Sequence, residues 1–172
     1  MPDLDGRGAL LSLDVLSPRG QLTREQEERA IALFERRYPG FTFARTPKDQ
    51  PAILDGVIVR SGIIVALVET KCRELLLDTF RGYGWRAILT ASKLDAGMRA
   101  AREWRVPFVF WFYSAAEDWL LVQRVCNPDG TAVIDIERRR SRTQQTCNGG
   151  SIVRENAYLD LSRANLLRGE RA

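Results

Sequence analysis

The residues IIVALVETK (63–71) decide the fold, because they predict a strand that is apolar on both faces. Side chains alternate between the two sides of a strand, and the alternating sets are Ile63, Val65, Leu67 and Ile64, Ala66, Val68. Strands of this kind lie inside a sheet that is covered on both sides. We therefore expect an α/β protein in which helices flank a central mixed sheet.

The same strand ends in two charged side chains, Glu69 and Lys71, which are two residues apart and share one face. Upstream, DGVIVR (55–60) predicts a strand that pairs with it through a tight turn at residues 61–62. A strict two-residue turn sets Asp55 diagonally across from Glu69, whereas a bulge brings the two level. In either case, two carboxylates and an amine converge where apolar strands end.

The remaining pattern predicts one domain over residues 1–172, with a core over about 22–125 and C-terminal strands with a basic loop over about 126–172. A helix is expected to begin near Thr23, which forms a capping-box pattern with Gln26, and to stop at residues 39–40. Further strands are expected at 41–45, 108–113, 118–125, 131–137 and 157–161, a helix from about 90 or 92 to 104, and a loop or lid at 138–150; glycines interrupt any helix at 73–89.

The composition removes several kinds of chemistry. The 172 residues contain no histidine, which excludes a Ser-His-Asp triad, a Cys-His pair and His-ligated zinc or haem. An enzyme with this composition has to use carboxylates, lysines, hydroxyls or a hard metal ion bound by oxygen. The 26 basic and 22 acidic side chains give a net charge of +4, which permits a nucleic-acid partner.

Cysteine spacing and hydropathy indicate the compartment. Cys72, Cys126 and Cys147 are far apart and odd in number, so the sequence offers neither a disulfide framework nor a CxxC zinc site. A reducing cytoplasm is the expected location. No apolar run reaches the length of about eighteen residues that a membrane-spanning helix needs, and no membrane contact is expected.

The paired carboxylates predict a metal ion. Two buried carboxylates are costly unless a positive group lies between them, and Mg²⁺ prefers carboxylate oxygens and waters. Asp55 and Glu69 are therefore the candidate ligands for Mg²⁺, with Mn²⁺ as a substitute, and the backbone carbonyl of Thr70 is a third candidate. Lys71 beside such an ion would orient an attacking water or follow its proton at a phosphorus atom.

At these residues the sequence resembles the PD-(D/E)xK nuclease superfamily. The pattern of a helical Glu, an Asp and a Glu-x-Lys, followed by a helix and a strand, occurs as Glu27, Asp55 and residues 69–71, within about 22–113. Leu54 precedes Asp55, so the Pro-Asp pair that gives the family its name is absent. The resemblance implies a restriction-endonuclease-like αβββαβ core with extra C-terminal strands.

The resemblance also implies roles for single residues. It implies that Asp55 and Glu69 bind Mg²⁺, that Lys71 assists the attacking water, and that Glu27 completes the site. The segment ILTASKLDAGMRAAREWRVPFVFWFY (88–113) is similar to the second helix and fourth strand of Holliday-junction-resolvase-like and phage members. In those members a lysine at the position of Lys93 points back at the site.

Each candidate residue also has a purely structural explanation. Asp55 suits a turn before glycine, and Glu69 with Lys71 suits an ion pair on an exposed strand end. Glu27 suits the positive end of a helix, and Lys93 suits a solvated helix terminus. The basic run, whose arginines are Arg138, Arg139, Arg140 and Arg142, fits phosphate contact and a solvated loop equally well.

Two classes of function follow. The first is a Mg²⁺-dependent endonuclease that hydrolyses DNA phosphodiester bonds through Asp55, Glu69 and Lys71. The second is a catalytically silent DNA-binding or assembly module of the same fold. The complete set of charged residues favours the enzyme, because a silent module has no need to keep two costly carboxylates together. DNA is the expected partner, and a homodimer is compatible with the sequence.

Overall fold

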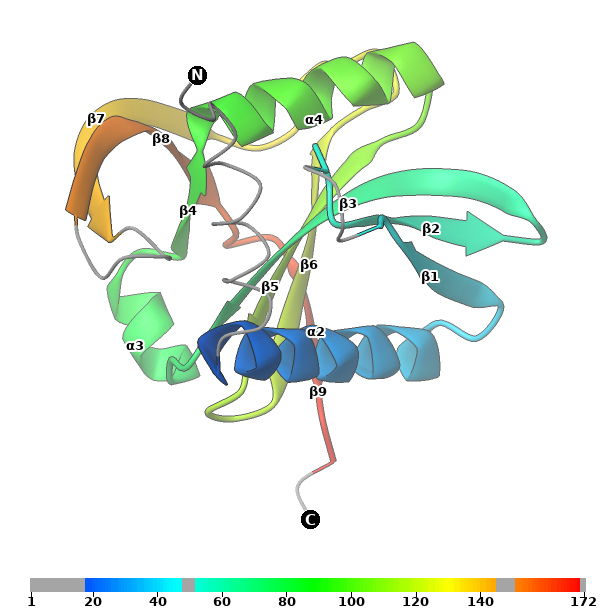
Figure 1. Ribbon diagram of the computed structural model, residues 1–172, viewed down its shortest axis with the longest axis horizontal. Helices are drawn as coiled ribbons and strands as arrows, with labels where there is room; N and C mark the ends of the chain where they lie inside the picture. Colours follow the sequence, from blue (N-terminus) through cyan, green and yellow to red (C-terminus); the bar gives the residue numbers. More distant parts are fainter. Residues whose placement is uncertain (1–17, 48–51, 145–150, 171–172) are drawn as a thin grey trace, which may run out of the picture.

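The computed structural model describes residues 18–47, 52–144 and 151–170. It contains a mixed sheet, a smaller antiparallel sheet and helices, so the expected α/β class is confirmed (Figure 1). The elements in chain order are α2 (Pro18–Arg37), β1 (Phe41–Arg45), β2 (Gly56–Arg60), β3 (Ile63–Arg73), α3 (Leu77–Gly82), β4 (Arg86–Thr90), α4 (Ala91–Trp104), β5 (Phe108–Ser114), β6 (Trp119–Cys126), β7 (Ile136–Gln144), β8 (Ser151–Asp160) and β9 (Asn165–Arg168).

The larger sheet has the strand order β1-β2-β3-β5-β6-β9. Neighbouring strands are antiparallel, except that β3 and β5 run parallel and pair from Leu67 with Phe108 to Arg73 with Ser114. A parallel pair needs a crossover connection, and α3, β4 and α4 supply it. The position of β3 between two strands confirms that the doubly apolar segment lies in the interior of the sheet.

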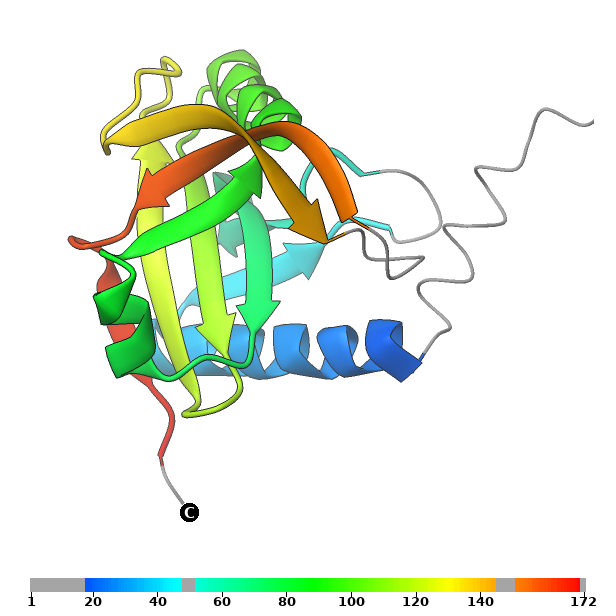
Figure 2. The same cartoon turned by 90° about the vertical axis from the view of Figure 1, so that its left-hand side faces the viewer.

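Two apolar clusters lie on opposite faces of this sheet. On one face, α2 packs Ala30, Leu33 and Phe34 against residues such as Val68 and Trp111. The other face is covered by α4 and the smaller sheet, whose strand order is β4-β8-β7 (Figure 2). The buried residues on that face include Leu67, Phe80, Leu89, Leu94, Phe110 and Leu159. Because β3 alternates, Glu69 and Lys71 follow Leu67 onto the face of α4 and the smaller sheet.

The C-terminal third differs from its sequence prediction. The segment expected to be a strand at 131–137 forms an isolated bridge between Ala132 and Cys126, and a regular strand begins only at Ile136. The basic stretch expected to be a loop or lid is strand β7 as far as residue 144, and residues 145–150 lie outside the described part. The last predicted strand, 157–161, is the end of β8, and β9 follows it.

The first helix is longer than expected, and the second has the predicted bounds. The first begins at Pro18 rather than near Thr23, while the second begins at Ala91 and ends at Trp104 as predicted. The uncertain segment 73–89 contains α3 and β4, separated by a turn that includes Gly84. No helix in the described part of the chain is long and apolar enough to cross a lipid bilayer.

Helix α4 packs so closely on β5 that one glycine position tests the interface. A methyl group at Gly97 would lie 2.7 Å from the ring of Phe108, which is fully buried. Helix propensity alone favours alanine over glycine by about 1 kcal/mol. We expect Gly97→Ala instead to lower the free energy of unfolding by about 1–2 kcal/mol, because overpacking outweighs propensity. Urea denaturation of wild type and variant measures the difference.

The matched control is Gly82→Ala, at the end of α3, where an added methyl group would have no atom within 4 Å. We expect this variant to keep or slightly raise the free energy of unfolding. A Gly97→Ala protein as stable as wild type would contradict the tight contact between α4 and β5.

Candidate functional site

A β-bulge aligns the two candidate carboxylates. The register pairs Gly56 with Val68, and one residue further along sets Asp55 level with Glu69. The register shifts after Ile58, which inserts one extra residue on the β3 side of the hairpin. Of the two arrangements left open by the sequence, the bulged one is therefore correct.

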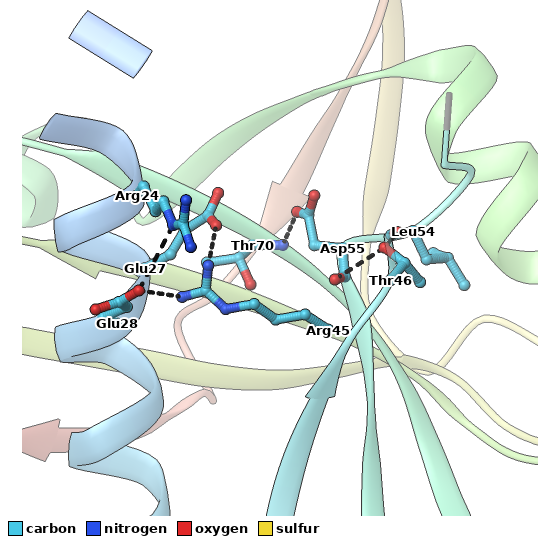
Figure 3. Close-up of polar contacts among 8 residues, drawn as sticks. All are labelled: Arg24, Glu27, Glu28, Arg45, Thr46, Leu54, Asp55 and Thr70. Carbon is cyan, nitrogen blue, oxygen red and sulfur yellow. Dashed lines mark hydrogen bonds and ion pairs between the residues drawn. The ribbon is translucent and has the colours of Figure 1, made fainter. Parts of the chain in front are cut away.

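Backbone contacts fix the position of Asp55, as Figure 3 shows. Its Oδ2 atom accepts a hydrogen bond of 2.8 Å from the backbone N–H of Thr70. The hydroxyl of Thr46 donates toward the carbonyl oxygens of Leu54 and Asp55, at 2.6 and 3.0 Å. These contacts tie the segment before β2 to the end of β1, so the carboxylate faces β3 with little freedom.

Glu69 is a buried carboxylate with an unsatisfied oxygen. The residue is 3% exposed, and its Oε1 atom accepts a hydrogen bond of 2.5 Å from Nζ of Lys93, in the first turn of α4. Its Oε2 atom is buried and has no hydrogen-bond partner. Burial, and then the negative charge of Asp55, raise the pKa of Glu69 to about 7, although Lys93 and Lys71 oppose the shift.

Two amines balance this negative charge. Burial, and then the charge of Arg73, lower the pKa of Lys71 to about 8, and the charges of Lys93 and Arg154 act in the same direction. Burial works to lower the pKa of Lys93, but the carboxylates of Glu69 and Asp55 outweigh it and raise the pKa. The two lysines therefore differ, because Lys93 is held charged by its ion pair whereas Lys71 is close to releasing its proton at neutral pH.

Glu27 lies at the edge of the site on a different layer. It projects from α2, which covers the opposite face of the sheet, and its Oε2 atom is 3.7 Å from the guanidinium of Arg45 (Figure 3). The same guanidinium is 3.6 Å from Glu28. The negative charge of Glu27 nevertheless contributes to the raised pKa of Lys93, so it acts on the site across the end of the sheet.

Cys72 follows Lys71 but points to the other face, where it packs against the cluster under α2. Burial, and then the charges of Glu27 and Asp55, raise the pKa of its thiol to about 12. A thiol in that state carries almost no thiolate at neutral pH. Cys72 is therefore a packing residue and not a nucleophile.

The donor set for a metal ion is small. In the described ranges, no three Cys, Asp or Glu side chains gather into a metal-binding group. Asp55 and Glu69 supply two carboxylates, and the unsatisfied Oε2 of Glu69 is an oxygen that a cation would satisfy. Mg²⁺ is commonly bound by one or two carboxylates and several waters, so this pair with the Thr70 carbonyl suits Mg²⁺ better than a fully protein-ligated ion.

The four arginines of the basic run do not form the loop that the sequence predicted. They lie on β7, where alternation sends Arg139 to the side opposite the other three. Arg138 makes a two-pronged ion pair with Asp95 of α4, and the Arg139 guanidinium lies 3.9 Å from the centre of the Tyr158 ring. Arg140 and Arg142 are exposed and remain the members of the run best placed to meet a phosphate.

Three residues near the site had no role in the sequence analysis: Arg45, Thr46 and Arg154. The first two follow from the end of β1, which the bulged hairpin brings beside Asp55. Arg154 belongs to β8, whose pairing with β4 depends on contacts between segments far apart in the chain. A position at the end of a predicted strand could have suggested Arg45, but nothing local indicates Arg154.

Comparisons with known proteins leave the site to be judged on its own chemistry. No protein-family model matches the sequence, and a search of curated proteins finds no significant match.

The raised pKa of Glu69 predicts how stability depends on pH. Its carboxyl titrates near 4.5 when unfolded and near 7 in the folded protein, so folding retains a proton and stability falls as pH rises between these values. In EDTA, Glu69→Gln should abolish that fall, so the stability of the variant relative to wild type should rise by about 3 kcal/mol between pH 4.5 and pH 8. Urea denaturation at a series of pH values measures both curves.

Glu103→Gln, at an exposed position on α4, is the control and should follow the wild-type curve. Parallel curves for wild type and Glu69→Gln from pH 4.5 to 8 would contradict the burial and charge environment described for Glu69.

Proposed function

We propose that this protein is a metal-dependent endonuclease that hydrolyses DNA phosphodiester bonds. The observation that carries the proposal is the buried Glu69 carboxylate, with an unsatisfied oxygen, level with Asp55 and two residues from an amine whose pKa is about 8. The supporting topology is α2, β1, β2, β3, α4 and β5, the αβββαβ order that the PD-(D/E)xK resemblance implies, with α3 and β4 inserted before α4.

Asp55, Glu69 and the carbonyl of Thr70 would hold Mg²⁺ or Mn²⁺ in this proposal. A bound divalent ion supplies charge stabilisation for a phosphate oxygen and lowers the pKa of a coordinated water. The bond from the Thr70 N–H orients the Asp55 carboxylate toward β3. The arrangement needs no histidine, which agrees with the composition.

Lys71 is the proposed general base, which accepts a proton from the attacking water. It shares a face of β3 with Glu69, and an amine with a pKa near 8 is deprotonated in part at neutral pH. In its neutral form Lys71 can accept a proton from the attacking water, which is the task of a general base. Arginine cannot replace it, because a guanidinium keeps its proton at any working pH.

Lys93 and Glu27 have supporting roles in the proposal. The Lys93 ammonium stabilises the ionised form of Glu69, the form that can bind a cation. Glu27 adds negative charge at the edge of the site and is held there by Arg45. Both residues therefore adjust the charge around Asp55 and Glu69.

The proposed substrate is DNA because the charge of the chain and the exposed Arg140 and Arg142 of β7 favour a polyanion. The thiols of Cys72 and Cys126 are free, which suits a reducing compartment, and we propose the cytoplasm. A catalytically silent DNA-binding module is the second candidate, and only the pair of costly carboxylates argues against it. Cleavage of plasmid and four-way-junction DNA in Mg²⁺, with EDTA as the control, separates the two.

Metal binding is the first expected result. Isothermal titration should detect Mg²⁺ or Mn²⁺ binding to wild type, and Asp55→Ala or Glu69→Ala should abolish it because each removes one of the two carboxylates. Asp78→Ala, which removes a 91%-exposed carboxylate on α3, should bind metal like wild type. Equal affinity in all four proteins would refute the assignment of Asp55 and Glu69.

Two substitutions test the role of Lys71: alanine removes the amine, whereas arginine keeps a positive charge that cannot give up its proton. Lys71→Ala should leave folding and Mg²⁺ binding nearly intact and lower the single-turnover cleavage rate by roughly 10²-fold or more. Lys71→Arg should restore little of the rate, because guanidinium does not give up its proton. If Lys71 were only an ion-pair partner of Glu69, the arginine variant would be fully active, and that outcome would remove the catalytic assignment.

A further inference from the structure

Arg154 lies close to the site although it is far from it in sequence. The register of the smaller sheet pairs Asn156 of β8 with Thr90, the last residue of β4. Arg154 precedes Asn156 by two residues on β8, so it lies on the same face of the strand, at a position beyond the end of β4. Helix α4 begins at that point, and Lys93 of its first turn bonds Glu69. Figure 2 shows β7 and β8 continuing past β4 at the start of α4.

The guanidinium of Arg154 is incompletely satisfied. Its Nε atom is buried and has no hydrogen-bond partner. A buried donor without an acceptor is unfavourable, and arginine offers a planar fork of donors that matches two oxygens of one anion. Arg154 therefore lacks an acceptor that an anionic ligand would provide.

Arg154 also shares its surroundings with other cations. Its charge acts on Lys71 together with the charges of Arg73 and Lys93. Like charges in a partly buried region repel each other, and an anion placed among them relieves the repulsion. The positive end of α4 adds to this field, because Thr90 makes no capping bond through its side chain and the first turn has no acidic residue.

We propose that Arg154 forms the binding site for a phosphodiester group of the substrate, donating to two non-bridging oxygens. The inference rests on the proposed function and extends it to a residue of β8, outside the segment that carries the family resemblance. Arg154 binds and orients the phosphate, while Lys71 remains the residue that exchanges a proton. The smaller sheet is thereby part of the substrate site as well as a cover for the apolar core.

The test measures binding without cleavage. The affinity of the full chain for a short labelled DNA duplex is measured in EDTA at several KCl concentrations, for wild type, Arg154→Ala, Arg154→Gln and Arg154→Lys. Arg154→Ala and Arg154→Gln should weaken binding about ten-fold or more and lower the salt slope by about one. Arg154→Lys should restore the slope but not the full affinity, because an ammonium does not form the two-pronged contact. Arg124→Ala, which removes an exposed arginine of β6, is the control for net charge.

Two further measurements keep the outcomes distinct. A duplex with neutral methylphosphonate linkages should bind wild type and Arg154→Gln equally, because the phosphate charge is gone. Inorganic phosphate should raise the melting temperature of wild type but not of Arg154→Gln, which retains the size of the side chain if Arg154→Ala fails to fold. Unchanged affinity and slope in Arg154→Gln would overturn the phosphate site. Absence of cleavage by wild type in Mg²⁺ would instead overturn the nuclease, whatever the binding results.

Discussion

The cost of keeping the Glu69 carboxylate inside the protein is the constraint on which the site depends. The residue is 3% exposed on an interior strand, and a charge there persists only with compensation from neighbouring groups. Lys93 supplies part of that compensation through a direct ion pair, and one carboxylate oxygen remains without a partner. The apolar packing on both faces of the sheet offsets the unfavourable burial of this carboxylate.

The two faces of the sheet contribute differently. The face under α2 is almost entirely apolar and aromatic, with Phe34 and Trp111 in contact at 4.7 Å between ring centroids. The other face begins as an apolar core around Phe80 and Phe112 and becomes polar toward Glu69 and Lys71. Helix α4 begins directly after β4, and its first turn supplies the Lys93 amine that bonds Glu69, so the start of this helix adjoins the candidate site.

Local sequence pattern determines much of this arrangement and fails where long-range contacts decide it. The doubly apolar segment, its hairpin partner and α4 were predictable because their periodicity is strong. The bulge that levels Asp55 with Glu69 was one of two arrangements, since turn length alone does not fix register. The basic run has charged residues on both faces and so lacks the alternation that predicts a strand, and its strand conformation follows from its pairing with β8. The position of Arg154 depends on the same pairing.

Strand β7 lies at the edge of the smaller sheet, where its outer backbone groups have no neighbouring strand in the described structure. Such an edge can recruit a strand from another molecule, and charged side chains are a common protection against this. We therefore expect the arginines of β7 to disfavour pairing between the β7 strands of two molecules. Replacing them together with neutral residues would expose a nine-residue template for intermolecular β-pairing, so aggregation could be mistaken for a change in ligand binding.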